Sequence, residues 1–185
     1  MQEEILAFWF GTVPGTERAE WFRKDIAFDT AIREGFGTTI EAALQGAYGE
    51  WSETPRGSLA RVLLLDQFTR NVFRDTPRAF AGDPQALATS QQALARGFDS
   101  TLLPTQRWFL YMPFQHSEES EVQQQSIELF SGLAVETGLA SPLEWARRHA
   151  AIVERFGRFP HRNAILGRAS TPEEDAFLRT PGSRF

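Results

Sequence analysis

The sequence predicts an all-α protein, and three observations favour this class. Apolar residues recur at helical spacing along most of the chain, as in the run Phe28, Ile32, Phe36, Ile40 and Leu44. Helix start signals precede several of these segments. Apolar and polar residues alternate nowhere over a length typical of a β-strand. We therefore expect seven or eight helices in an array of packed antiparallel pairs, forming one domain over residues 1–185.

The first half of the chain contains three expected helices. The apolar run above predicts a long helix over residues 25–45. The most apolar helix is expected to follow over residues 58–74, and it should occupy the centre of the fold because it has almost no polar face. Asp83-Pro84 is typical of a helix start, with an N-cap residue before a proline, and Gly97 is typical of the matching end.

The second half contains four further helix starts. Thr105 opens a short helix, which the Met112-Pro113 step is expected to end because a residue before proline disfavours helical backbone. Ser117 is expected to cap the next helix, whose acidic first turn suits the positive end of the helix dipole. Ser141 and Thr171 each begin a capping box with proline in place, which predicts two more helices.

Composition excludes several classes of protein. The net charge of -5 and a pI near 5.3 argue against a nucleic-acid partner. The absence of cysteine excludes disulfides, thiolate nucleophiles and cysteine-ligated zinc. The longest aliphatic run, residues 62–65, is far too short to span a bilayer, and the acidic N-terminus lacks the positive start of a signal peptide. We expect a cytoplasmic protein with no membrane partner; the oligomeric state is not predicted.

A strip of polar residues lies inside the most apolar helix. Asp66 and Arg70, Gln67 and Asn71, and Arg70 and Arg74 are each four residues apart, so they share one helix face. Charged groups in a buried helix must be paired, hydrogen-bonded or facing a cavity. One interpretation is a binding site. The other is an intrahelical Asp66–Arg70 pair whose neighbours tie adjacent backbones together, since buried polar groups are commonly structural.

Residues 111–118 form a second polar segment. His116 and Ser117 are expected at a helix N-terminus, where unpaired backbone N–H groups can hold an anion. The structural alternative is a capping or core histidine bonded to a carbonyl. Residues 159–168 form a third segment, with His161, Arg162 and Asn163 beside apolar residues. Its structural alternative is a loop whose polar side chains satisfy exposed carbonyls.

These segments are locally basic within an acidic protein. Residues 61–78, which include Arg78 after the polar strip, hold four arginines and two aspartates, and residues 158–168 hold three arginines and no acid. If the segments converge, they form a positive pocket with two histidines at its rim, and arginine binds carboxylate or phosphate well. We therefore predict that Arg70, His116 and Arg162 border one pocket.

The three segments also carry a family resemblance. The runs at residues 64–74, 113–118 and 159–168 resemble an uncharacterised bacterial family, domain of unknown function 924 (DUF924), and the likeness extends from residues 8–11 to residues 171–174. The resemblance implies a tetratricopeptide-like arrangement of helix pairs and no established activity. Phosphate-loop, dinucleotide, zinc-protease and nucleophile-elbow motifs are absent, so neither a cofactor nor a metal is expected.

Two functional hypotheses remain. The first is a small-molecule binding protein or enzyme for a phosphate- or carboxylate-bearing ligand, with hydrolysis or proton transfer as the reaction. His116 or His161 would act as general acid or base, and Asp66 or Glu118 would orient an imidazole or an arginine. The second is a protein-interaction module whose concave helical groove binds an acidic peptide. The ligand-binding residues expected for the first hypothesis are Gln67, Arg70, Asn71, Arg74, Arg78, Ser117, Arg162 and Asn163.

Overall fold

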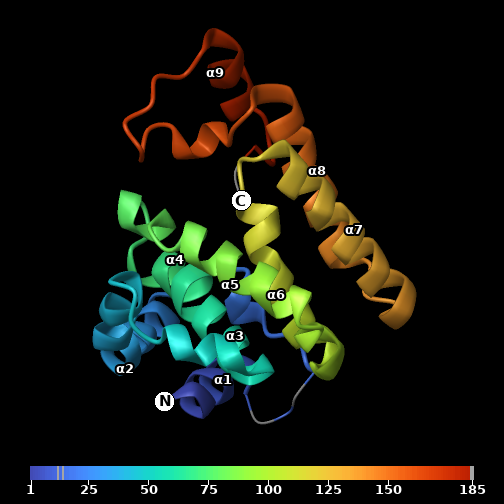
Figure 1. Ribbon diagram of the computed structural model, residues 1–185. Helices are drawn as coiled ribbons and strands as arrows, with labels where there is room; N and C mark the ends of the chain where they lie inside the picture. Colours follow the sequence, from blue (N-terminus) through green and yellow to red (C-terminus); the bar gives the residue numbers. More distant parts are fainter. Residues whose placement is uncertain (12, 14, 184–185) are drawn as a thin grey trace.

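The all-α class predicted from the sequence is confirmed. A computed structural model describes residues 1–11, 13 and 15–183, and these ranges contain helices and turns but no β-strand (Figure 1). Among the described residues, no helix combines the length and apolar character needed to cross a membrane. The α-helices are α1 (Gln2–Phe10), α2 (Ile26–Leu44), α3 (Pro55–Val62), α4 (Thr69–Val72), α5 (Asp83–Ala95), α6 (Pro104–His116), α7 (Ser120–Thr137), α8 (Ser141–Phe156) and α9 (Pro172–Leu178).

Local capping explains the helices whose bounds agree with the sequence. The Asp25 side chain accepts a hydrogen bond from the Phe28 N–H at the start of α2. The capping box of α9 is confirmed, because the Thr171 hydroxyl and the Glu174 carboxylate each accept a bond from the other's backbone N–H. α5 begins near the expected position, but Asp83 is its first helical residue and Gly82, not Asp83, is the N-cap residue.

Three expected boundaries are wrong. α3 begins at Pro55 and not at residue 58, because the Thr54 hydroxyl caps it. α6 continues through Pro113 to His116, since the burial of its residues 108–115 outweighs the local preference of a residue before proline. α7 therefore starts at Ser120, and Ser117 ends α6 and does not cap α7. α8 does start at Ser141, but without a side-chain cap.

The central helix contains a π-helical segment. α3, the π-helix η3 (Leu63–Phe68) and α4 run on without a break. All six residues of η3 are buried, which confirms that Leu63, Leu64 and Phe68 belong to the core. Two side chains also bond to carbonyls of this segment: the Thr69 hydroxyl donates to Leu65 O (2.9 Å) and Arg70 Nη1 to Asp66 O (2.7 Å). π-helical turns are frequent at functional sites.

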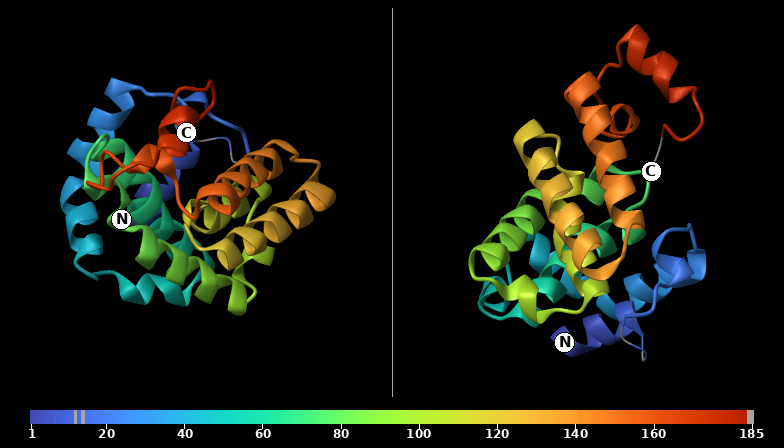
Figure 2. Two further views of the ribbon diagram at one scale, coloured as in Figure 1. Left: turned by 90° about the horizontal axis from the view of Figure 1, so that it is seen from above. Right: turned by 90° about the vertical axis from the view of Figure 1, so that its right-hand side faces the viewer.

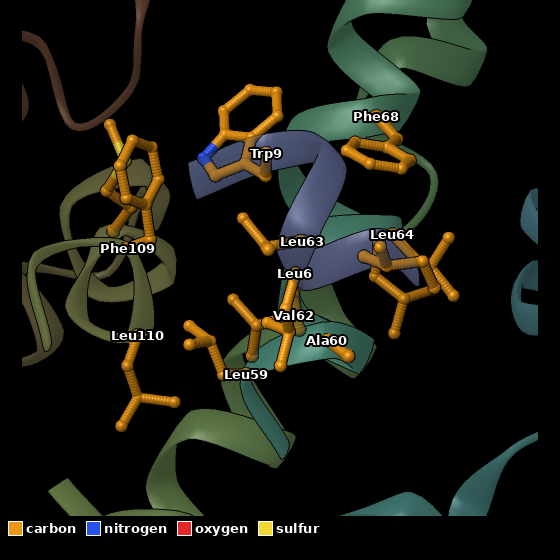
Figure 3. Close-up of a cluster of buried hydrophobic side chains, with 14 of the residues drawn as sticks. Leu6, Trp9, Leu59, Ala60, Val62, Leu63, Leu64, Phe68, Phe109 and Leu110 are labelled. Carbon is orange, nitrogen blue, oxygen red and sulfur yellow. The ribbon is translucent and has the colours of Figure 1, made fainter. Parts of the chain in front are cut away.

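The main hydrophobic core surrounds this central helix. Figure 3 shows Trp9 of α1, Leu59 of α3 and Leu63 of η3 gathered near Phe109 of α6. α7 and α8 lie side by side next to α6 (Figures 1 and 2). A second, smaller cluster formed by α8 and Phe159 anchors the segment after α8. That segment lies at the end of the molecule opposite α1 (Figure 1), where it reaches the candidate site.

Candidate functional site

The three polar segments identified in the sequence converge on one cavity of about 550 Å³. Arg70, His116 and Arg162 all line it, as predicted, although the chain separates them by up to 92 positions (162 − 70). The cavity is lined by six parts of the chain: the end of the central helix, the turn η4 (Pro77–Phe80), the last turns of α6, α8, the turn η6 (Pro160–Arg162), and the turn η1 (Ala19–Trp21) with the residues after it.

A buried aspartate–histidine pair forms the centre of the site. Asp66 Oδ1 lies 2.7 Å from His116 Nδ1, and the Asp66 side chain is 0% exposed. Gln67 Nε2 donates to the other Asp66 oxygen (2.6 Å), and Arg70 Nη1 lies 3.2 Å from Oδ1. Because α6 extends to His116, this residue lies at a helix C-terminus. The predicted helix N-terminus at this position is therefore wrong, and it provides no backbone anion site.

Burial and neighbouring charges set the ionisation of this pair. Burial alone would raise the pKa of Asp66, but Arg70 and His116 lower it below its ordinary value. Burial and Arg70 lower the pKa of His116, and these two effects outweigh the Asp66 carboxylate, which raises it. Since both pKa values are lowered, Asp66 is ionised and His116 is neutral at neutral pH. The Nδ1 hydrogen of His116 then donates to Asp66.

A second ion-pair group adjoins the first. Asp83, at the start of α5, accepts two hydrogen bonds from Arg70, at 2.8 and 3.0 Å. Arg162 Nη1 lies 3.4 Å from the same carboxylate, and Arg162 Nη2 donates to His116 O (3.0 Å). Arg70 is thus bonded to carboxylates on both sides, since it also contacts Asp66. The intrahelical pair considered from the sequence does form, but as part of a network that crosses the fold.

Two further predicted ligand-binding residues bind a carboxylate of α2. Arg74 donates to both oxygens of Asp29, at 2.6 and 2.9 Å, and Asn71 Nδ2 donates to Asp29 Oδ1 (2.7 Å). Burial raises the pKa of Asp29, but the bonds from Arg74 and Asn71 reverse this effect and lower it. Arg74, Asn71 and Gln67 line the cavity, with the arginine charge already neutralised.

Five predicted residues do not line the cavity themselves. One is Asp66, which is fully buried and contacts the lining residue His116. Arg78 is exposed and pairs with Glu41 on the protein surface. The Ser117 hydroxyl accepts a bond from the Glu119 N–H, so it terminates α6 locally. Glu118 accepts two bonds from Arg168 and one from the Phe159 N–H, which ties residues 159–168 to the body. Asn163 Nδ2 donates to the hydroxyl of Ser170, two residues beyond this segment.

All three histidines of the chain line the cavity. Burial lowers the pKa of His149 to about 3 and that of His161 to about 4, with the nearby His116 and Arg162, respectively, adding to the effect. His149, which the sequence analysis did not assign to the site, lies on α8, and its ring centroid is 6.0 Å from that of His116. From the sequence, neither Asp29 nor Asp83 is assigned to the site, and Asp83 is interpreted only as a helix cap.

The cavity brings together side chains that can donate hydrogen bonds or exchange a proton. Within residues 1–11, 13 and 15–183, no three histidine, aspartate or glutamate side chains gather as a metal site would require. The described cavity instead offers histidines, arginines and amides next to aromatic side chains. Such a wall can orient an organic molecule and exchange a proton with it.

Residues 5–182 match a bacterial family described as a protein of unknown function, DUF924. The chain belongs to this family. The DUF924 chain is also similar to a solved structure of a protein of unknown function from Agrobacterium tumefaciens, with 40% sequence identity, a TM-score of 0.87, and 96% of each chain covered. A comparison with curated proteins finds no match. The likeness of this DUF924 member to known proteins therefore covers almost the whole chain.

Proposed function

We propose that this DUF924 protein is an enzyme that acts on a small molecule and uses His116 as its general base and acid. The observation that carries the proposal is the 2.7 Å contact between Asp66 Oδ1 and His116 Nδ1 at the wall of a 550 Å³ cavity. A carboxylate that accepts the Nδ1 hydrogen fixes the tautomer and leaves the Nε2 lone pair to accept a proton.

The electrostatics of the pair favour this role. His116 is neutral at neutral pH because its pKa is lowered, so it can accept a proton without first losing one. Once His116 is protonated, the adjacent Asp66 carboxylate stabilises the imidazolium. Gln67 and Arg70 hold Asp66 in place, which makes Asp66 a positioning residue. Removal of a proton from water leads to hydrolysis, and removal of a proton from carbon leads to proton transfer; both reactions begin with the same step at His116.

The shape of the cavity favours a small molecule over the acidic peptide considered from the sequence. Its lining residues come from distant parts of the chain, from Trp21 to Ile165, and gather at one concave site, whereas a peptide groove follows one extended concave face. His161 lines the same cavity and is proposed as the second acid–base group. The tetratricopeptide-like superhelix remains a prediction. A cytoplasmic location is proposed on composition alone, because the chain is acidic and has no cysteine.

The proposal is tested by turnover of a panel of nitrophenyl esters, anilides and phosphate monoesters. We expect at least one class to be turned over, and His116→Gln to lower kcat/KM by about 10²–10⁴-fold. Arg56→Gln is the matched control, because Arg56 pairs with Glu3 away from the cavity. If the parent and His116→Gln turn over every probe at the same rate, the proposed role of His116 is wrong.

A further inference from the structure

One wall of the cavity is aromatic and takes no part in the acid–base chemistry. Trp21, Phe22, Trp108 and Trp145 line this side. Phe22 and Trp145 are 53% and 39% exposed, whereas most aromatic rings of the core are buried. The ring of Phe22 stacks on Trp108, with centroids 5.0 Å apart, so part of this wall is held in place by ring packing. A flat or apolar group that covered these rings would remove apolar surface from water.

Among the lining arginines Arg70, Arg74 and Arg162, the charge of Arg162 is the least neutralised. Arg70 and Arg74 each make two short bonds to a carboxylate. The carboxylate oxygen that Arg162 contacts lies 3.4 Å away, belongs to Asp83, and also accepts a bond from Arg70 at 3.0 Å. Arg162 therefore shares its counter-charge with a second arginine.

Arg162 also has hydrogen-bond donors to spare. A guanidinium has five N–H donors, and Arg162 uses one toward Asp83 and one toward His116 O. Its Nε makes no hydrogen bond to any described residue, although the side chain is only 8% exposed. The group is held rigidly, because it lies 4.6 Å from the ring centroids of both Phe80 and Phe159. Burial, with Arg70 nearby, lowers the pKa of Arg162 to about 10, so an added negative charge would stabilise the cation.

We propose that the ligand of this cavity is an amphipathic monocarboxylate, with its carboxylate on Arg162 and its aromatic or other apolar body against Phe22, Trp108 and Trp145. The inference rests on the proposed function, because it concerns the same cavity, but it is tested by binding and not by turnover. One under-neutralised arginine matches one negative charge. A phosphate dianion would need a second free cation beside Arg162, where Arg70 and Arg74 are both occupied. Arg23 and Lys24 also line the cavity, but they follow Phe22 directly in the chain, next to a residue of the aromatic wall. A planar carboxylate also fits the fork of a guanidinium.

Isothermal titration calorimetry with four probes, at constant ionic strength, measures separately what the carboxylate and the apolar body contribute to binding. The probes are 3-phenylpropionate, its neutral amide, acetate and phenyl phosphate. We expect saturable 1:1 binding of 3-phenylpropionate, tighter than the amide by about tenfold or more, because hydrogen bonds to charged groups exceed those to neutral ones. Acetate lacks the apolar body and phenyl phosphate carries the extra charge, so both should bind more weakly. Equal affinity for acid and amide, tighter binding of phenyl phosphate, or no binding of the acid overturns the inference.

Variants test whether the carboxylate binds Arg162 and the apolar body binds the aromatic residues. Arg162→Lys keeps the positive charge but loses the paired N–H donors of the guanidinium, so it should reduce the preference for 3-phenylpropionate over its amide. Arg162→Gln should abolish this preference. Trp145→Ala, at a partly exposed position, should weaken the acid and the amide by the same factor. His116→Gln should still bind the acid, so that a failure of the acid–base role is seen separately from a failure of this inference. A preference for the acid that survives in a folded Arg162→Gln, as judged by its melting transition, overturns the assignment to Arg162.

Discussion

Gly82 lies against the π-helical segment that carries Asp66, and its replacement by alanine tests how tightly the site is built. A Cβ added at this position would come within 2.9 Å of the Leu65 carbonyl carbon, within 3.0 Å of its Cα, and closer still to its oxygen. The backbone of Gly82 is ordinary right-handed helical, so the effect of alanine comes from this contact and not from strained dihedral angles. Since both partners are backbone, the start of α5 must move away from η3.

We expect Gly82→Ala to lower the free energy of unfolding by about 3 kcal/mol, at the upper end of the usual cost of overpacking a core. Gly132→Ala in α7 is the matched control: Gly132 is exposed, an added Cβ would meet no atom within 4 Å, and alanine should stabilise this helix by about 0.5–1 kcal/mol. Urea denaturation followed by circular dichroism measures both changes. Because Asp83 follows Gly82, the variant should also disturb the ion pairs of Arg70 and Arg162. A Gly82→Ala protein as stable as the parent would refute this account of the π-helical segment.

Three further predictions concern the core and the charges. Leu64→Ala should cost about 2–5 kcal/mol in urea denaturation, because Leu64 is fully buried; a loss below 1 kcal/mol would show that the core lies elsewhere. Asp66→Asn should cost about 3–5 kcal/mol, since Arg70 and Arg162 would then share only Asp83, and an unchanged midpoint would contradict the network. His149 binds a proton below about pH 6.5 when unfolded but only near pH 3 when folded, so stability should fall as pH decreases between these values. The slope from His149 is about 1.4 kcal/mol per pH unit, and an equally steep profile in His149→Gln would contradict it.

Much of the fold could be predicted because its signals are local. Asp25 and Thr171 bond to backbone N–H groups within three residues, so their helices can be found from short patterns. The end of α6 could not be predicted in this way. The Met112-Pro113 step locally favours a break, and only the burial of α6 among distant residues keeps it helical. The π-helical turn at Leu63–Phe68 has no sequence pattern of its own.

The candidate site could also be predicted only in part, where the signals are local. Asp66, Arg70 and Arg162 could be identified because they are charged within apolar or aromatic surroundings, which requires a partner or a cavity. Their counter-charges could not be identified, because Asp29 and Asp83 occupy positions that also suit an exposed helix residue and a cap. His149 depends on tertiary structure alone: α8 places it 6.0 Å from His116, across more than thirty residues of sequence. Arg78 belongs to the same locally basic stretch as Arg74, but it pairs with Glu41 on the surface.

The protonation state of His116 tests the central claim most directly. Nitrogen-15 NMR of histidine-labelled protein distinguishes the two neutral tautomers and the imidazolium, and the His116→Gln spectrum assigns the signals, because the chain has three histidines. We expect His116 at pH 7 to be neutral with its hydrogen on Nδ1, and Asp66→Asn to alter this state, because Asp66 Oδ1 lies 2.7 Å from Nδ1. A His116 ring that is protonated at pH 7, or that is neutral with its hydrogen on Nε2, would contradict the account.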